Sequence, residues 1–191
     1  RARHETKLAF RVNGKITRRW VENGAHVKAG QVLAEIDPSD YQLSTQAKQA
    51  QLASARAELG TTQADWQRYQ TLHAQNFISA AELQRRETAY IAAQAKFDQA
   101  RAELSNSGNQ VAYTRLLAPH AGVVTGLEAE AGQVVNAGQT ILRLANPQEL
   151  EVVISVAENQ INALKQADGI NVRLWADPDH PLEGRLRELA A

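Results

Sequence analysis

An internal repeat restricts the possible folds of this chain more than any other feature of its sequence. Gly14-Lys15-Ile16-Thr17, Gly24 and Ala29-Gly30-Gln31 recur, without a gap, as Gly122-Val123-Val124-Thr125, Gly132 and Ala137-Gly138-Gln139. Short β-branched segments broken by glycines indicate strands joined by tight turns. Neither copy is long enough to fold alone, so we expect the two copies to pair and close into one small β-sandwich.

The repeat also predicts where the strands and turns lie. Strands are expected at residues 10–16, 26–27 and 32–36 of the first copy, and at 122–125, 134–135 and 140–144 of the second. Glycine adopts a positive φ at little steric cost, so each repeated glycine is expected to supply one in a turn. These turn glycines are Gly14, Gly24, Gly30, Gly122, Gly132 and Gly138.

The residues between the two copies, 38–110, follow a helical period instead. Asp37-Pro38-Ser39 is a helix start signal, because Pro fits the first turn and a flanking Asp or Ser accepts from free backbone N–H groups. Leu52, Leu59 and Trp66 then recur every seventh residue, and the second half repeats this pattern after a break at residues 75–78. The segment is predicted to be an antiparallel α-hairpin, with arms on the order of 50 Å long.

Composition and motifs argue against several classes of function. Lys plus Arg and Asp plus Glu each number 21, so no excess of positive charge indicates a nucleic-acid surface. The chain has no Cys, and its 5 His residues are scattered singly. Nucleotide-binding glycine loops and the common hydrolase motifs are missing as well. We therefore expect no enzyme, no cofactor, no bound metal and no nucleic-acid partner.

A lipoyl/biotinyl-type motif that is split by a coiled-coil hairpin resembles the bacterial membrane fusion proteins, the HlyD-like periplasmic adaptors. The two halves are Gly14 to Ile36 and Gly122 to Leu144. Leu117-Ala118-Pro119-His120-Ala121-Gly122-Val123-Val124 is similar to the family's entry into the second half, although His120 and Ala121 differ from the commoner residues there. The lead-in from Leu8 to Ile16 is most similar to adaptors of resistance-nodulation-division (RND) efflux pumps.

This resemblance implies an α+β fold in several parts. Residues 1–7 would be a lead-in that belongs to a β-barrel. Residues 8–37 and 111–146 would form the two halves of the lipoyl-like β-sandwich, and 38–110 the long antiparallel coiled-coil hairpin that interrupts it. Residues 147–191 would be part of a β-barrel domain.

Arg68, Leu72 and Ser79 have the spacing of an Arg, a Leu and a Ser by which RND-type members contact a TolC-type outer-membrane channel. By this resemblance Arg68 would form charge-assisted hydrogen bonds, Leu72 would fill an apolar groove, and Ser79 would donate or accept at the turn. Each residue also has a purely structural explanation. Arg68 could be a solvated helix residue, Leu72 could close the seam, and Ser79 with Glu82 matches a capping box.

The function implied is that of a periplasmic adaptor subunit of a tripartite efflux pump, which bridges an inner-membrane transporter, here of RND type, and a TolC-type channel. It would export small toxic compounds, assemble into a ring of six, and be anchored to the inner membrane of a Gram-negative bacterium by a segment before Arg1. One alternative is an adaptor of an ABC-type or type I secretion exporter. A lipoyl/biotinyl carrier is the other, but neither Lys28 nor Lys48 is expected on the exposed turn that a carrier needs.

Overall fold

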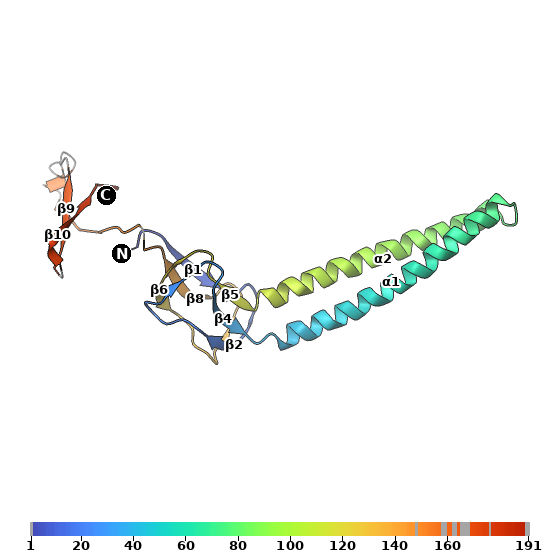
Figure 1. Ribbon diagram of the computed structural model, residues 1–191, viewed down its shortest axis with the longest axis horizontal. Coiled ribbons are helices and arrows are strands. Elements are labelled where there is room, and N and C mark those ends of the chain that lie inside the picture. Colours follow the sequence, from blue (N-terminus) through green and yellow to red (C-terminus); the bar gives the residue numbers. More distant parts are fainter. Residues whose placement is uncertain are drawn as a thin grey trace. The chain divides into compact units, whose positions relative to one another are not determined.

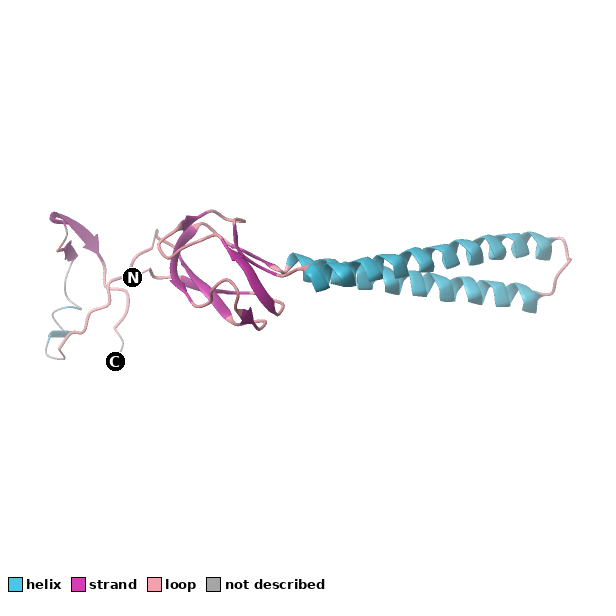
Figure 2. Cartoon of the chain, turned by 90° about the horizontal axis from the view of Figure 1, so that it is seen from below, coloured by secondary structure: helices cyan, strands magenta, loops and turns pink. Residues whose placement is uncertain are grey.

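The computed structural model describes residues 2–147, 149–157, 160–161, 164, 169–175 and 177–189. The chain divides into two compact units, one from Ala2 to Leu150 and the other from Glu151 onward. The first unit joins a small β-sandwich to a long helical hairpin, and the second contains a pair of strands (Figures 1 and 2). The mixed α+β class expected from the sequence is confirmed.

Within the described residues, the sandwich takes strands from both copies of the repeat. The first copy supplies β1 (Glu5–Ala9), β2 (Gly14–Arg19), β3 (His26–Val27) and β4 (Val32–Ile36). The second copy supplies β5 (Arg115–Leu117), β6 (Gly122–Leu127), β7 (Val134–Val135) and β8 (Thr140–Ala145). One sheet has the order β1-β8-β6-β3 and the other the order β5-β4-β2-β7.

The repeat relates these two sheets to each other. If every strand is replaced by its counterpart in the other copy, the order β1-β8-β6-β3 becomes β5-β4-β2-β7. Pairing also crosses between the copies, since Gly14 lies opposite Val135 and Gly122 lies opposite Val27. Each sheet therefore contains strands of both copies, and neither copy can complete a sheet by itself.

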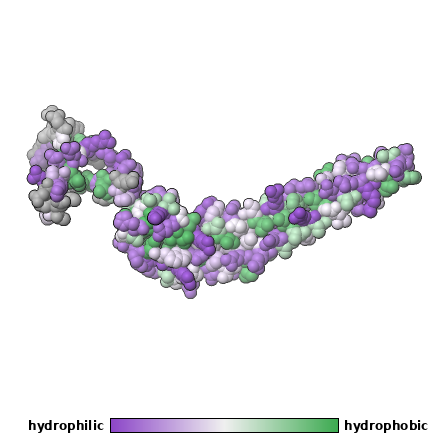
Figure 3. All heavy atoms as spheres, in the orientation of Figure 1, coloured by the Kyte–Doolittle hydropathy of each residue, from purple (hydrophilic) through white to green (hydrophobic). Residues whose placement is uncertain are grey.

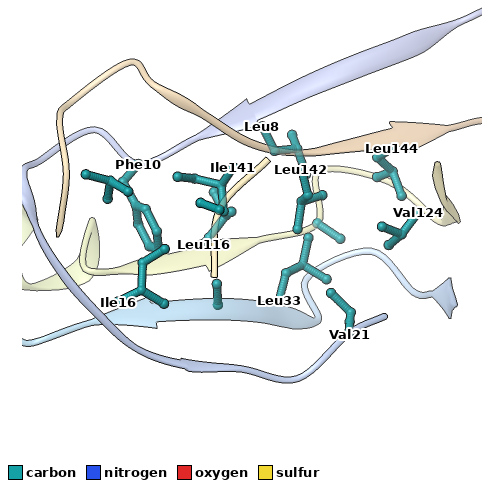
Figure 4. Close-up of a cluster of buried hydrophobic side chains, with 14 of the residues drawn as sticks. Leu8, Phe10, Ile16, Val21, Leu33, Leu116, Val124, Ile141, Leu142 and Leu144 are labelled. Atoms are coloured by element: carbon teal, nitrogen blue, oxygen red, sulfur yellow. The ribbon is translucent and has the colours of Figure 1, made fainter. Parts of the chain in front are cut away.

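The hydrophobic core of the first unit lies between the two sheets (Figure 4). Equivalent positions of the repeat fill it, because Leu33 and Ile36 of β4 and Ile141 and Leu144 of β8 are all 0% exposed. Phe10 adds an aromatic ring that is 1% exposed. Full burial of one such side chain stabilises the fold by about 1.5–3 kcal/mol, so this layer holds the sandwich together.

Four of the six repeated glycines have a positive φ: Gly24 (85°), Gly30 (76°), Gly132 (93°) and Gly138 (81°). Gly14 and Gly122 do not, so the expectation of positive φ is wrong for this pair. They begin β2 and β6, where neighbouring atoms approach closely. A Cβ at Gly122 would lie 2.5 Å from the carbonyl oxygen of Ala145, and one at Gly14 would lie 3.0 Å from Cδ1 of Ile36. Glycine is needed at these two positions because a side chain would not fit, and not because the backbone has a special conformation.

Two expectations about the N-terminal strands are also wrong. The strand expected at 10–16 begins only at Gly14, because residues 10–13 form a bend between β1 and β2. β1 pairs antiparallel with β8, so residues 5–7 of the expected barrel lead-in belong to the sandwich. β1 lies at the edge of its sheet, where polar residues such as Glu5 and Lys7 face solvent, and its sequence therefore shows little apolar pattern.

The hairpin consists of α1 (Ser39–Ala74) and α2 (Ala80–Ala112), which run side by side from the sandwich (Figures 1 and 2). Small side chains are buried where the helices meet, namely Ala55, Ala93, Ala100 and Ser107. Lys48 Nζ also donates to Glu103 across the seam at 2.7 Å. At 1.5 Å per residue each helix is about 50 Å long. Small seam residues allow the two helices to approach closely.

The second unit contains β9 (Ile170–Leu174) and β10 (Asp177–Gly184), which pair antiparallel. Apolar side chains of this unit are exposed, including those of Val153 and Ile154. A two-stranded sheet does not by itself make a barrel. The partial β-barrel expected at 147–191 stays a prediction.

Candidate interaction site at the hairpin tip

A closed turn joins the two helices at the hairpin tip. The backbone N–H of Asn76 donates to the carbonyl of His73 at 2.9 Å, and that of Phe77 donates to the carbonyl of Leu72 at 3.0 Å. Asn76 has a φ of 59°, a left-handed conformation that Asn tolerates and that ends many helices. Ser79 then starts α2, and its Oγ accepts from the backbone N–H of Glu82 at 3.3 Å.

Arg68, Leu72 and Ser79 all lie at this end of the hairpin. The Arg68 side chain is 66% exposed and forms an ion pair with Asp65, one turn earlier on α1. Leu72 is partly buried in the last turn of α1, and the Ser79 hydroxyl caps α2. The structure therefore brings the three residues to one end of the hairpin, with the Ser79 hydroxyl engaged in the turn.

Beside them lies a cross-helix cluster, which we call the tip brace: Tyr69 of α1 with Glu82 and Arg86 of α2. The Arg86 guanidinium lies 4.5 Å from the centroid of the Tyr69 ring, and its Nη2 donates to the Tyr69 hydroxyl at 3.3 Å. Arg86 Nε also donates to Glu82 at 3.0 Å. A charge-assisted contact of this kind ties the two helices together just below the turn.

The electrostatics of the brace favour its charged forms. Desolvation alone would raise the pKa of the Glu82 carboxyl, but hydrogen bonds from Arg86 and Arg85 outweigh it and hold that pKa below its usual value. The hydrogen bond to Glu82 raises the pKa of Arg86. The charge of Glu82 is therefore balanced by two arginines of its own helix.

Sequence reasoning missed both this brace and the exposure of Phe77. The spacing of Glu82 to Arg85 and Arg86 is a helical i,i+3 and i,i+4 pattern, which could have indicated the ion pairs on α2. Nothing in the spacing shows that Tyr69 lies opposite Arg86. Phe77 is 72% exposed in the turn, and a large apolar residue in a predicted turn was the available signal for it.

A second surface feature lies on the sandwich, where Trp20, Val32, Glu35 and Arg115 line a shallow groove. Trp20 is 49% exposed, and Arg115 Nε donates to Glu35 at 3.2 Å. At the equivalent face of the other sheet Arg143 pairs with Glu128 at 2.7 Å. The repeat is thus symmetric in its core and differs on its outer faces.

The described residues contain no cluster of three or more His, Cys, Asp or Glu side chains suited to a metal ion. None of the helices in that part of the chain combines the length and the apolar character needed to cross a bilayer. Figure 3 shows hydrophobic residues along the visible side of the hairpin, interspersed with hydrophilic ones.

Comparison with known proteins gives one family across the first unit. Residues 5–145 match the model of the RND MFP, barrel-sandwich hybrid domain. Multidrug resistance protein MdtA of Pectobacterium carotovorum subsp. carotovorum is 32% identical over 174 residues, which are 88% of this chain and 42% of that protein. The chain thus spans less than half the length of this curated relative.

Two solved structures show the same fold. MacA of Actinobacillus actinomycetemcomitans matches with a TM-score of 0.61 and 25% identity, over 84% of this chain and 55% of that one. The membrane fusion protein Spr0693 of Streptococcus pneumoniae matches with a TM-score of 0.69 over 100% of this chain and 80% of that one. It is only 18% identical, so this second likeness concerns the fold alone.

Proposed function

The chain belongs to the RND-type membrane fusion proteins, and on that premise we propose that it is a periplasmic adaptor subunit of a tripartite efflux pump. It would bridge an inner-membrane transporter of RND type and a TolC-type outer-membrane channel, for the export of small toxic compounds. The family is an adaptor class rather than an enzyme class. Energy and most of the substrate selectivity would then come from the transporter.

The observation that carries this proposal is a long hairpin whose tip is both firmly built and exposed. α1 and α2 extend about 50 Å and enclose only a narrow seam of small residues. Such a shape spans distance and offers little space for catalysis. The tip brace and the Ser79 cap order the far end, where Arg68 is 66% exposed.

The same geometry supports the proposal that several copies assemble. Hairpins that pack side by side into a tube would gain strength from many weak contacts, and multivalent contact at the tips would raise the avidity for a channel. We propose a ring of six copies in the periplasm, anchored to the inner membrane by an N-terminal segment. The region 147–191 would contact the transporter as part of a β-barrel domain.

The experiment that tests the docking role compares two charge reversals for binding to a detergent-solubilised TolC-type channel. Arg68→Asp changes the tip, whereas Arg56→Asp makes the same substitution at an exposed position on the shaft of α1. Arg68→Asp should weaken binding at least tenfold, because it removes a charge-assisted contact and adds a like charge facing the partner's acceptors. Arg56→Asp should bind as the wild type does.

Circular dichroism of each variant checks that the hairpin stays helical, because Arg68→Asp also breaks the ion pair with Asp65. Equal binding by the two variants would overturn tip docking. The hairpin would then be a packing element only.

A further inference from the structure

Phe77 differs from the other exposed apolar residues of the hairpin in its position. Leu43 and Ile91 are 62% and 58% exposed, but they lie on the shafts of α1 and α2. Single exposed apolar side chains of that kind are ordinary on protein surfaces. Phe77 is 72% exposed and lies in the turn itself, between Leu72 and Ser79.

The backbone around Phe77 is held in one conformation. Its N–H donates to the carbonyl of Leu72 at 3.0 Å, and the preceding Asn76 has a φ of 59°. Two residues later the Ser79 cap fixes the start of α2. A ring presented by an ordered turn loses little conformational freedom on binding, which favours its use as an anchor.

Charge around Phe77 favours a partner of opposite sign. The last two turns of α1, the tip turn and the first two turns of α2 span residues 68–86, which carry three arginines, Arg68, Arg85 and Arg86, and one carboxylate, Glu82. Glu82 is already paired with Arg85 and Arg86, and the next carboxylates, Asp65 and Glu87, lie outside this segment. The tip therefore presents one aromatic ring within a surface of net positive charge.

Resting on the proposed function, we propose that Phe77 is the apolar anchor of the docking contact. It inserts into an apolar pocket, bordered by carboxylates, at the periplasmic end of the outer-membrane channel. Arg68 and Arg85 face those carboxylates from the rim. Aromatic residues surrounded by polar groups are the usual centres of binding energy in protein interfaces.

The test uses the 191-residue chain and the solubilised channel, and it compares Phe77→Ser with Ile91→Ser. Both variants remove an exposed apolar side chain from the same hairpin. Loss of a buried ring should raise the Kd by about 10- to 100-fold for Phe77→Ser, whereas Ile91→Ser should leave it within about twofold. Phe77→Leu should restore much of the affinity, because it restores apolar area.

Salt dependence separates the anchor from its charged rim. The fold increase in Kd caused by Phe77→Ser should be the same at low and high ionic strength. The fold increase caused by Arg68→Asp should shrink at high ionic strength, because salt screens the charged contact. If Phe77→Ser binds like the wild type while Arg68→Asp does not, the anchor is wrong and the adaptor function stands. If neither variant changes the Kd, or the wild type does not bind the channel, tip docking fails and the anchor fails with it.

Discussion

At the scale of single residues, the repeated glycines differ in what a side chain would cost. A Cβ at Gly122 would meet the Ala145 carbonyl oxygen at 2.5 Å, and a backbone atom cannot move aside cheaply. At Gly24 a Cβ would meet nothing within 4 Å, and only the φ of 85° is unfavourable for alanine. We expect Gly122→Ala to lower the free energy of unfolding by about 3 kcal/mol and Gly24→Ala by about 1 kcal/mol.

Urea denaturation followed by circular dichroism measures both values on purified variants. Equal losses for Gly122→Ala and Gly24→Ala would contradict the close approach of β6 to β8. A larger loss for Gly24→Ala would do so as well.

Asp37 makes the start of α1 sensitive to acid. Its carboxylate accepts from the hydroxyl of Ser39 at 2.6 Å and from the backbone N–H of Ser39 at 3.0 Å, and these bonds hold the pKa of Asp37 below its usual value. Because the folded state lowers this pKa, the stabilisation is present above the unfolded pKa. It is lost as the pH falls through the folded value.

We therefore expect Asp37→Asn, which keeps an acceptor oxygen without the charge, to be less stable than the wild type at neutral pH. The difference in urea midpoint should narrow as the pH falls through the lowered pKa of Asp37, where the native carboxyl becomes protonated. A difference that stays constant from neutral pH down through the acid range in which Asp37 titrates would show that charge plays no part in this contact.

The repeat predicted a positive φ at all six glycines, and it could not separate the four turn glycines from Gly14 and Gly122. Positive φ at Gly24 or Gly132 belongs to a local turn, which neighbouring residues determine. Gly122 is needed because β8, from a distant part of the chain, passes close to it. Such long-range proximity leaves no mark in the local pattern.

At the scale of elements, each helix of the hairpin contains one glycine at a position where the structure does not require glycine. Gly60 on α1 and Gly108 on α2 are exposed, and a Cβ at either would meet nothing within 4 Å. Alanine loses less backbone entropy in a helix than glycine does. We expect Gly60→Ala and Gly108→Ala each to stabilise the hairpin by about 1 kcal/mol.

Hydrogen exchange of the hairpin amides is the suitable measurement, because it reports local opening of α1 and α2 separately from the sandwich. Protection should rise around each substitution. Reduced protection around residue 60 or 108 would show that flexibility there is needed for the packing of the two helices.

The heptad pattern predicted the hairpin because a seam of small and apolar residues repeats within each helix, as Ala93 and Ala100 illustrate. The tip brace escaped prediction because Tyr69 and Arg86 meet only when the register between the two helices is known. β1 and β5 escaped prediction for a related reason. Both are short strands at sheet edges, where pairing with β8 and β4 creates the strand and an apolar pattern is weak.

At the scale of the whole molecule, the first unit combines a compact base, the β-sandwich, with a long helical hairpin. Two interleaved copies of one motif form the sandwich, and their core residues, such as Leu33 and Ile141, occupy equivalent buried positions. The chain leaves this base after β4 and returns at β5, so both roots of the hairpin are fixed by one sheet. Such a base can hold the tip in place while the contact itself is made far from the core.

The central claim is that the hairpin tip meets an outer-membrane channel in the cell. Photo-crosslinking tests it most directly, with a photoreactive residue placed at Gln75 in the tip turn or at Gln49 on the shaft of α1, both of them exposed. In a bacterium that expresses the full-length protein with its pump, we predict a covalent adduct with the channel from position 75 and none from position 49. An active pump that gives no channel adduct from position 75, or gives one only from position 49, would contradict the account.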